Sequence, residues 1–195
     1  PNYLSPYINL FSVYNKIENF TESEKIIREA LKLYPKSDAI NNALGYSLLK
    51  QDKNQDAINF FEIAIKLNSK NYKAYFNIGN AYFKIKKFQK AIKYFEKTHS
   101  INSKAPETTF YLAECSKELR NYNKALKYYK IASKEKNSWL RKNKIIAKIL
   151  ECYLILNKKN DYLKDISIYS KADPDNRRIA ATSAFIAHQF NVRDQ

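Results

Sequence analysis

The chain has 195 residues, of which 45% are hydrophobic, so the composition excludes an intrinsically disordered protein. With 2 glycines and 5 prolines it has too few turn-forming residues for a β-rich fold, which favours an all-helical one. No apolar run reaches the ~18 residues of a membrane-spanning helix, so the sequence predicts none.

The net charge of +16 leaves three interpretations open. Lys, Asn, Ile and Tyr are abundant together, and A/T-rich codons encode all four, so genome composition explains the excess without any ligand. An acidic protein partner is the second interpretation. Nucleic acid is the third, and the scarcity of arginine counts against it.

Taken in chain order, residues 1–137 show internal similarity with a period of 34 residues. The units begin at residues 4, 38, 72 and 106 without an insertion, and each is predicted to be a pair of helices. One pair cannot bury its apolar face alone, so neighbouring pairs must stack. The recurring residues of the four units are Tyr7, Leu10, Tyr14, Ile27, Ala30 and Pro35; Leu44, Gly45, Leu48, Ala57, Phe61, Ala64 and Ser69; Tyr75, Ile78, Gly79, Tyr82, Ala91, Phe95 and Ser103; and Leu112, Ala113, Ala125, Tyr129 and Ala132.

Small residues predict where the two helices of one unit approach closely. They recur at one position of the first helix and at one position of the second. Phe61, Phe95 and Tyr129 are expected to fill the space between units. The small residues are Gly45, Gly79, Ala113, Ala57, Ala91 and Ala125.

Residues 138–174 predict a degenerate fifth pair, displaced by a three-residue insertion. Its first helix is expected to begin at Ser138 as N-cap and to end near Leu156. Tyr162 and Tyr169 stand where the other units have alanine, so the second helix is expected to lie further out. Residues 175–195 predict a last helix with Asp175 as N-cap, which caps the stack or joins it to something further along.

The repeated residues resemble the tetratricopeptide repeat family. The resemblance implies an all-α fold, a right-handed superhelical solenoid of helix–turn–helix units with a C-terminal capping helix. It also implies a scaffold that binds a peptide or a partner segment in a concave groove, which the first helices of the units line.

The family's contact positions, carried onto this chain, give a groove of amides, aromatics and lysines. Amide side chains can pair with both the donors and the acceptors of a peptide backbone, and aromatic side chains supply contact area. The implied groove residues are Asn9, Lys16, Asn42, Tyr46, Lys50, Phe76, Asn77, Asn80, Phe83, Lys84, Phe110, Tyr111, Glu114 and Lys117.

Two alternatives apply to these residues. Phe76 and Phe110 can instead pack between neighbouring first helices, and the regular spacing of Lys16, Lys50 and Lys84 can be either a cationic row or chance. The family's clamp for a terminal carboxylate is not expected, because only one of its positions carries a matching residue.

Few side chains suit catalysis. His99 and His188 belong to no common metal, acid–base or nucleophile motif. Cys115 and Cys152 share a unit position that other units fill with small residues, which favours packing. The sequence therefore predicts no catalytic residue, metal or cofactor, and a chain that is not itself an enzyme. Two cysteines give no disulfide framework, which favours a reducing, bacterial-type cytoplasm. Nothing in the sequence fixes the oligomeric state.

An alternative function comes from the end of the chain. No lysine follows Lys171, whereas Arg177, Arg178 and Arg193 lie there. The arrangement is similar to bacterial proteins with tetratricopeptide repeats ahead of an iron- and 2-oxoglutarate-dependent oxygenase domain, and other relatives precede glycosyl- or sulfotransferases. Because the chain begins with Pro1 and has no methionine, we expect a piece of a longer protein, whose repeats present a substrate or regulate an enzyme.

Overall fold

The computed structural model describes residues 4–105, 107–134, 139–172 and 177–193. Every regular element in these ranges is a helix, which confirms the all-α prediction. The chain forms two compact units, residues 1–108 and 109–195. None of the helices described combines the length and apolarity that crossing a membrane requires.

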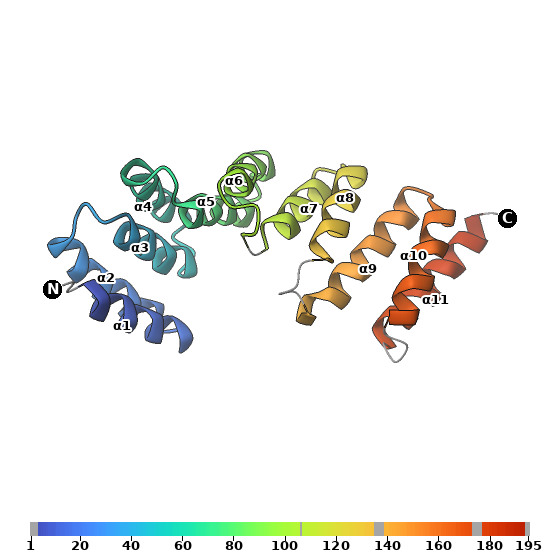
Figure 1. Ribbon diagram of the computed structural model, residues 1–195, viewed down its shortest axis with the longest axis horizontal. Coiled ribbons are helices and arrows are strands. Elements are labelled where there is room, and N and C mark those ends of the chain that lie inside the picture. The colour runs from blue at the N-terminus through green and yellow to red at the C-terminus, as the bar shows by residue number, and fades with distance from the viewer. Residues whose placement is uncertain (1–3, 106, 135–138, 173–176, 194–195) are drawn as a thin grey trace. The chain divides into compact units, whose positions relative to one another are not determined.

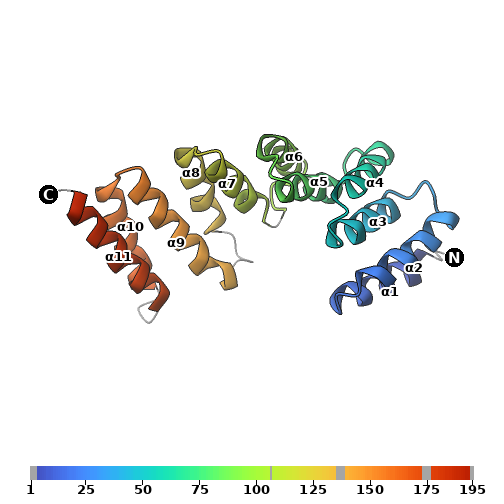
Figure 2. The same ribbon diagram turned by 180° about the vertical axis from the view of Figure 1, so that it is seen from behind.

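The first unit consists of helices that follow one another as antiparallel pairs (Figures 1 and 2). The first helices of its pairs begin 34 residues apart, at residues 4, 38 and 72. Each helix packs against the next along the chain, and α3 also contacts α1 and α5. The helices are α1 (Leu4–Lys16), α2 (Phe20–Leu33), α3 (Asp38–Lys50), α4 (Asn54–Leu67), α5 (Tyr72–Lys84) and α6 (Phe88–Ile101).

The turn between the helices of a pair has one conformation throughout the chain. The second residue after the first helix adopts positive φ, and the next backbone N–H donates to a carbonyl five residues back, as Lys87 does to Tyr82 at 2.8 Å. Such a left-handed residue ends a helix and reverses the chain. The residues with positive φ in these turns are Glu18, Asp52, Lys86, Arg120 and Asn157. The last interval is 37 residues instead of 34.

Glycine permits the close contact within two of the pairs. A Cβ atom on Gly45 would lie 2.6 Å from Cε1 of Phe61, and one on Gly79 would lie 2.6 Å from Cε1 of Phe95. Both phenylalanines are fully buried. The close approach expected at the glycines is therefore observed, and each ring lies against the glycine of its own pair.

The second unit keeps the helix pairs but buries tyrosine hydroxyls in its core. Tyr129, at the position of Phe95, donates to Glu114, and Tyr153 donates to Asp165. Both tyrosines are fully buried, so each hydroxyl requires an acceptor. The helices are α7 (Thr108–Glu118), α8 (Tyr122–Ala132), α9 (Trp139–Ile155), α10 (Lys159–Ala172) and α11 (Arg177–Arg193).

The last helix completes this core. α11 packs against both α9 and α10, and it buries Ile179, Ile186 and Phe190. Tyr162 of α10 is 2% exposed, lies with its ring centroid 5.3 Å from that of Phe190, and donates to the carbonyl of Ser183 at 2.7 Å. Tyr162 stands where the other units have alanine, and its larger ring is accommodated by packing against α11. The N-caps expected at Ser138 and Asp175 lie outside the described residues.

Candidate functional site

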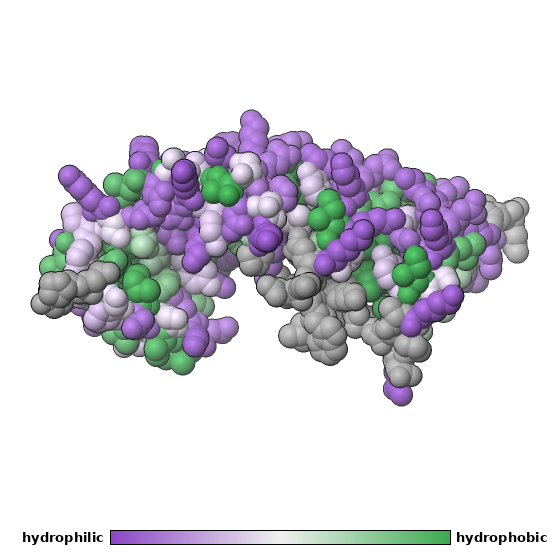
Figure 3. All heavy atoms as spheres, in the orientation of Figure 1, coloured by the Kyte–Doolittle hydropathy of each residue, from purple (hydrophilic) through white to green (hydrophobic). Residues whose placement is uncertain are grey.

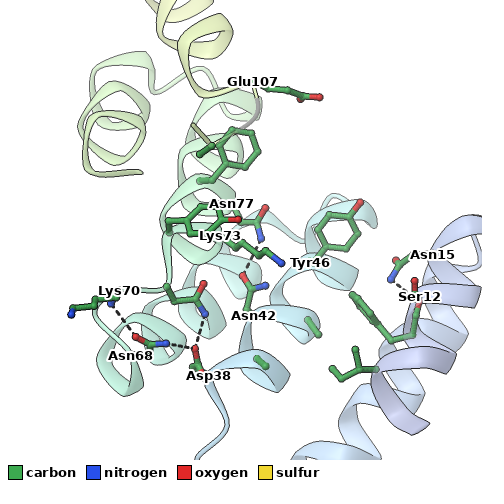
Figure 4. Close-up of a pocket in the computed structure, with 18 residues that line it drawn as sticks. Ser12, Asn15, Asp38, Asn42, Tyr46, Asn68, Lys70, Lys73, Asn77 and Glu107 are labelled. Atoms are coloured by element: carbon green, nitrogen blue, oxygen red, sulfur yellow. Dashed lines mark hydrogen bonds between the residues drawn. The ribbon is translucent and has the colours of Figure 1, made fainter. Parts of the chain in front are cut away.

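A groove of about 900 Å³ opens on one side of the first unit. Its walls are α1, α3 and α5, the first helices of three successive pairs (Figure 4). On α3, Asp38, Asn42 and Tyr46 follow one another at intervals of four and so form one stripe facing the groove. The helical period therefore decides which residues of each first helix reach this surface.

Two asparagines form the wall between α3 and α5. The side chain of Asn77 donates to Oδ1 of Asn42 at 3.0 Å, across the two helices. Asn77 is 8% exposed, whereas Asn42 is half-buried. Asn42 donates no hydrogen bond in the part of the chain that the structure describes, so its amide N–H groups are available to a ligand.

One end of the groove is held by a network around Asp38. Its Oδ2 accepts from the side chains of Asn68 at 2.8 Å and Asn71 at 2.9 Å. Oδ1 of Asn71 in turn accepts from the backbone N–H of Ala74 at 3.0 Å, which caps α5. The carboxylate therefore has a structural role, and the exposed Lys73 supplies a cation at the groove wall.

Aromatic side chains form the apolar part of the groove. Phe11 of α1 lies edge-on to Tyr46 of α3, with ring centroids 6.1 Å apart. Phe76 lines the groove and also packs against the buried Phe95, with centroids 5.6 Å apart. Phe76 thus belongs to both the core and the surface. Phe95 lies on α6, the second helix of the same pair, so this contact is not the packing between first helices that was the alternative.

Two comparisons place this architecture. Residues 10–62 and residues 72–104 each match a model of the tetratricopeptide repeat family. These two segments are tetratricopeptide repeats. A comparison with curated protein sequences gives no match.

Solved structures of tetratricopeptide repeat proteins share the fold. A MamA protein has a TM-score of 0.71 at 17% identity, over 86% of this chain and 90% of that chain. YrrB, described as a TPR protein with an unusual peptide-binding site, has a TM-score of 0.68 at 15% identity, over 92% and 91%. A thermophilic TPR protein of Thermus thermophilus has 0.66 at 13%, over 94% and 98%. At these identities the likeness shows the fold alone, a helical repeat solenoid.

Four of the residues implied by the tetratricopeptide resemblance line the groove together: Asn42, Tyr46, Phe76 and Asn77. Six others of the first unit do not line it, and binding by them stays a prediction. They are Asn9, Lys16, Lys50, Asn80, Phe83 and Lys84.

Several of these six side chains make contacts within the protein. Nζ of Lys84 lies 2.7 Å from Oδ1 of Asp52 and 3.1 Å from the carbonyl oxygen of Leu49. Nζ of Lys50 lies over the ring of Tyr46, 5.4 Å from its centroid. Phe83 packs edge-on against Phe88, with centroids 5.5 Å apart. In a shared cationic row of Lys16, Lys50 and Lys84, one member, Lys84, is therefore already paired with a carboxylate.

The remaining four implied residues belong to the second unit. Phe110 packs against Tyr111 and Tyr129, with centroid distances of 5.6 and 6.2 Å. Glu114 accepts from Tyr129 and lies 2.8 Å from Nζ of Lys148, with its side chain 14% exposed. Burial and this hydrogen bond raise the pKa of Tyr129 above its usual range. Glu114 therefore stabilises the core, and ligand contacts by these four, including Lys117, stay predictions.

Some groove residues could hardly be predicted from the sequence. Phe11, Asn15, Asn71 and Lys73 all line it, yet none was among the implied contacts. Asn71 is the N-cap of α5, and Lys73 lies in the first turn of that helix. Their position at the start of a unit is the sequence feature that could have pointed to them as groove residues. In the described ranges no group of three or more His, Cys, Asp or Glu side chains could hold a metal ion.

Proposed function

We propose that the groove of the first unit binds an extended peptide segment of a partner protein. Tetratricopeptide repeats are protein-interaction modules, so the chain is a scaffold, and the groove is the surface that best fits a segment. The observation that carries the proposal is the Asn42–Asn77 amide pair between two aromatic walls.

The amide pair suits the backbone of a peptide. Asn42 retains amide donors for a peptide carbonyl, and the bond to Asn77 holds the Asn42 side chain in place before binding. A preorganised side chain loses less conformational entropy when a ligand arrives. Such contacts are made to the peptide backbone, so the groove can accept segments of many different sequences.

The rest of the groove supplies area and charge. Tyr46 and Phe76 offer ring surface, a kind of contact that dominates many binding interfaces. Lys70 and Lys73 line the groove together with Asp38 and Glu107, so its formal charges balance, and the segment is expected to be held by its backbone and apolar side chains. The peptide-binding site described for YrrB is consistent with this use of the same fold.

The test fills the groove without touching the core. Ala39 lines the groove and is exposed, so Ala39→Trp should block a segment while preserving the helix. We expect peptides selected from a displayed random library by the wild-type protein to bind this variant at least about tenfold more weakly by fluorescence anisotropy. The matched control is Asn59→Trp, an exposed position of α4 outside the groove, which should bind like wild type. Equal affinity of both variants would contradict the proposal.

The alternative function, a non-catalytic arm of a longer enzyme, is favoured by one feature of the second unit. Phe185 of α11 is 60% exposed beside a groove of about 520 Å³ that Leu154 and Ile155 also line. An exposed apolar patch of this kind suits a neighbouring domain. Reading the gene beyond Gln195 tests the idea, since a stop codon within a few residues would end it.

A further inference from the structure

Positive charge is concentrated in one stretch of the first unit. Residues 66–104 contain ten lysines and a single acidic residue, Glu96, a local net charge of +9. The stretch covers α5, α6 and the turns beside them. In Figure 3 the surface over α6 is largely hydrophilic. Genome composition raises lysine everywhere, but it does not explain why acidic residues are nearly absent from this stretch.

Three of these lysines form a row on α6. Lys90, Lys93 and Lys97 are exposed, and their intervals of three and four place them on one face of the helix. The opposite face buries Ala91 and Phe95 in the core. The lysine row, as we call these three residues, extends over roughly 10 Å of helix axis.

Two lysines of the row lie over tyrosine rings. Nζ of Lys90 lies 5.4 Å from the ring centroid of Tyr82, and Nζ of Lys97 lies 6.0 Å from that of Tyr75. Tyr94 stacks on Tyr82, with ring centroids 5.5 Å apart. These cation–π contacts restrict the ammonium groups without neutralising their charge.

Within the described residues, the charge of the row has no carboxylate partner. Among the residues that the structure describes, no carboxylate lies within 4.0 Å of Lys90, Lys93 or Lys97. Elsewhere in the unit lysines do have such partners, as Lys84 has Asp52 at 2.7 Å. In the described part of the first unit the row therefore offers an anionic ligand three ammonium groups without a carboxylate partner, and two of them, those of Lys90 and Lys97, are held over tyrosine rings.

We infer that the lysine row is a docking surface for an acidic segment of a partner protein, separate from the groove. The row lies on α6, whereas the groove is lined mainly by α1, α3 and α5. Side chains on one side of an extended segment recur about every 7 Å, and residues three or four apart on a helix are spaced about 4.5–6 Å along its axis, a difference that flexible lysine side chains can bridge. Alternate carboxylates of an acidic segment can therefore each meet one lysine.

The chemistry of the row favours carboxylates over nucleic acid. All three cations are ammonium groups, which lack the two-pronged geometry with which guanidinium binds phosphate. Single-stranded nucleic acid also requires free aromatic faces on which bases stack. Here Tyr82 and Tyr75 are covered by Lys90 and Lys97, and Tyr94 is stacked on Tyr82.

The experiment compares two variants of equal charge with a fluorescein-labelled oligoglutamate peptide as probe. One carries Lys90→Gln, Lys93→Gln and Lys97→Gln. The other removes the same charge from exposed positions on and just after α2, by Lys25→Gln, Lys32→Gln and Lys36→Gln. We expect the row variant to bind about tenfold more weakly, the combined effect of three exposed ion pairs, and the α2 variant to change by less than about twofold.

Other outcomes would overturn the inference. Equal weakening in both variants means that the probe responds to total charge alone. A labelled oligothymidine that binds wild type more tightly than oligoglutamate, and loses this affinity in the row variant, assigns the surface to nucleic acid instead. Ala39→Trp separates this inference from the groove proposal, since it should leave oligoglutamate binding unchanged. Circular dichroism of both variants checks that the helices remain folded.

Discussion

At Gly79 the two helices of a pair approach so closely that the position accepts no side chain. The nearest atoms belong to the ring of Phe95, which is fully buried and cannot turn away without opening the core. Gly45 faces Phe61 in the same way. These positions explain why a chain with only 2 glycines places both of them inside helices.

Gly79→Ala tests this contact. In an ordinary helix the change stabilises by about 1 kcal/mol, because alanine is the better helix former. Here the added Cβ would lie 2.6 Å from Cε1 of Phe95, so overpacking should dominate and lower the free energy of unfolding by about 1–3 kcal/mol. Urea unfolding followed by circular dichroism measures the difference. A higher midpoint than wild type would show that the ring relaxes at little cost.

Among the elements, the turns between helices are the most regular feature. The left-handed residue recurs at Glu18, Asp52, Lys86, Arg120 and Asn157, although none of these is glycine. Non-glycine residues in this conformation carry a steric cost of about 1–2 kcal/mol. The repeat thus tolerates a small strain at each turn, in exchange for a fixed reversal of the chain.

Lys86→Gly should therefore stabilise the protein. The φ of Lys86 is 58°, its side chain is exposed, and glycine adopts this conformation without strain. We expect a gain of about 0.5–1 kcal/mol, since the greater freedom of glycine in the unfolded chain offsets part of the relief. Lys93→Gly, in the middle of α6, is the matched control and should cost about 1 kcal/mol. Thermal unfolding of both variants provides the comparison, and a loss of stability in each would refute the argument.

The elements also show what the sequence could predict. The 34-residue period placed the helices, because each unit repeats the same apolar positions and the same N-cap chemistry, as at Ser37 and Asn71. The groove was only partly predictable. Asn42 and Asn77 were implied as ligand contacts, but their mutual hydrogen bond joins residues 35 apart. A local pattern does not state which side chains on neighbouring helices turn toward each other.

On the scale of the whole molecule, the two units differ in how they fill the core. The first unit uses Phe61 and Phe95, whereas the second uses tyrosines together with Cys115 and Cys152. Burial raises the pKa of Cys115 to about 12 and that of Cys152 to about 11. Both thiols are therefore protonated at neutral pH, which agrees with packing rather than redox chemistry.

The raised pKa values of these buried groups predict that the folded protein becomes less stable at alkaline pH. The pKa of Cys115 rises from 9.0 in a free thiol to about 12 in the fold, so the folded state keeps the proton longer. The stability that this group contributes is complete below pH 9 and is lost as the pH rises toward 12. Burial also raises the pKa of Tyr169, from 10.0 to about 12, so its ionisation lowers stability at alkaline pH in the same direction.

The measurement is the urea midpoint at about pH 8, where the contribution of the thiol is complete, and at about pH 11, where much of it is lost. Cys115→Ala is the comparison variant, because Ala81 occupies the equivalent position of the preceding unit. We expect wild type to lose stability between the two conditions and the variant to lose less. An identical loss in both would remove Cys115 from the explanation.

The sequence by itself determined that this protein is a stack of helix pairs, because the apolar and small residues recur with the period of the pair and act through neighbours in the chain. It did not determine which polar side chains remain free for a ligand. Only the tertiary structure decided that Lys84 is paired with Asp52, that Asp38 is held by two amides, and that no carboxylate of the described residues pairs with the lysine row. Charges and amides find their partners across helices, where distance in space and not spacing in sequence sets the energy.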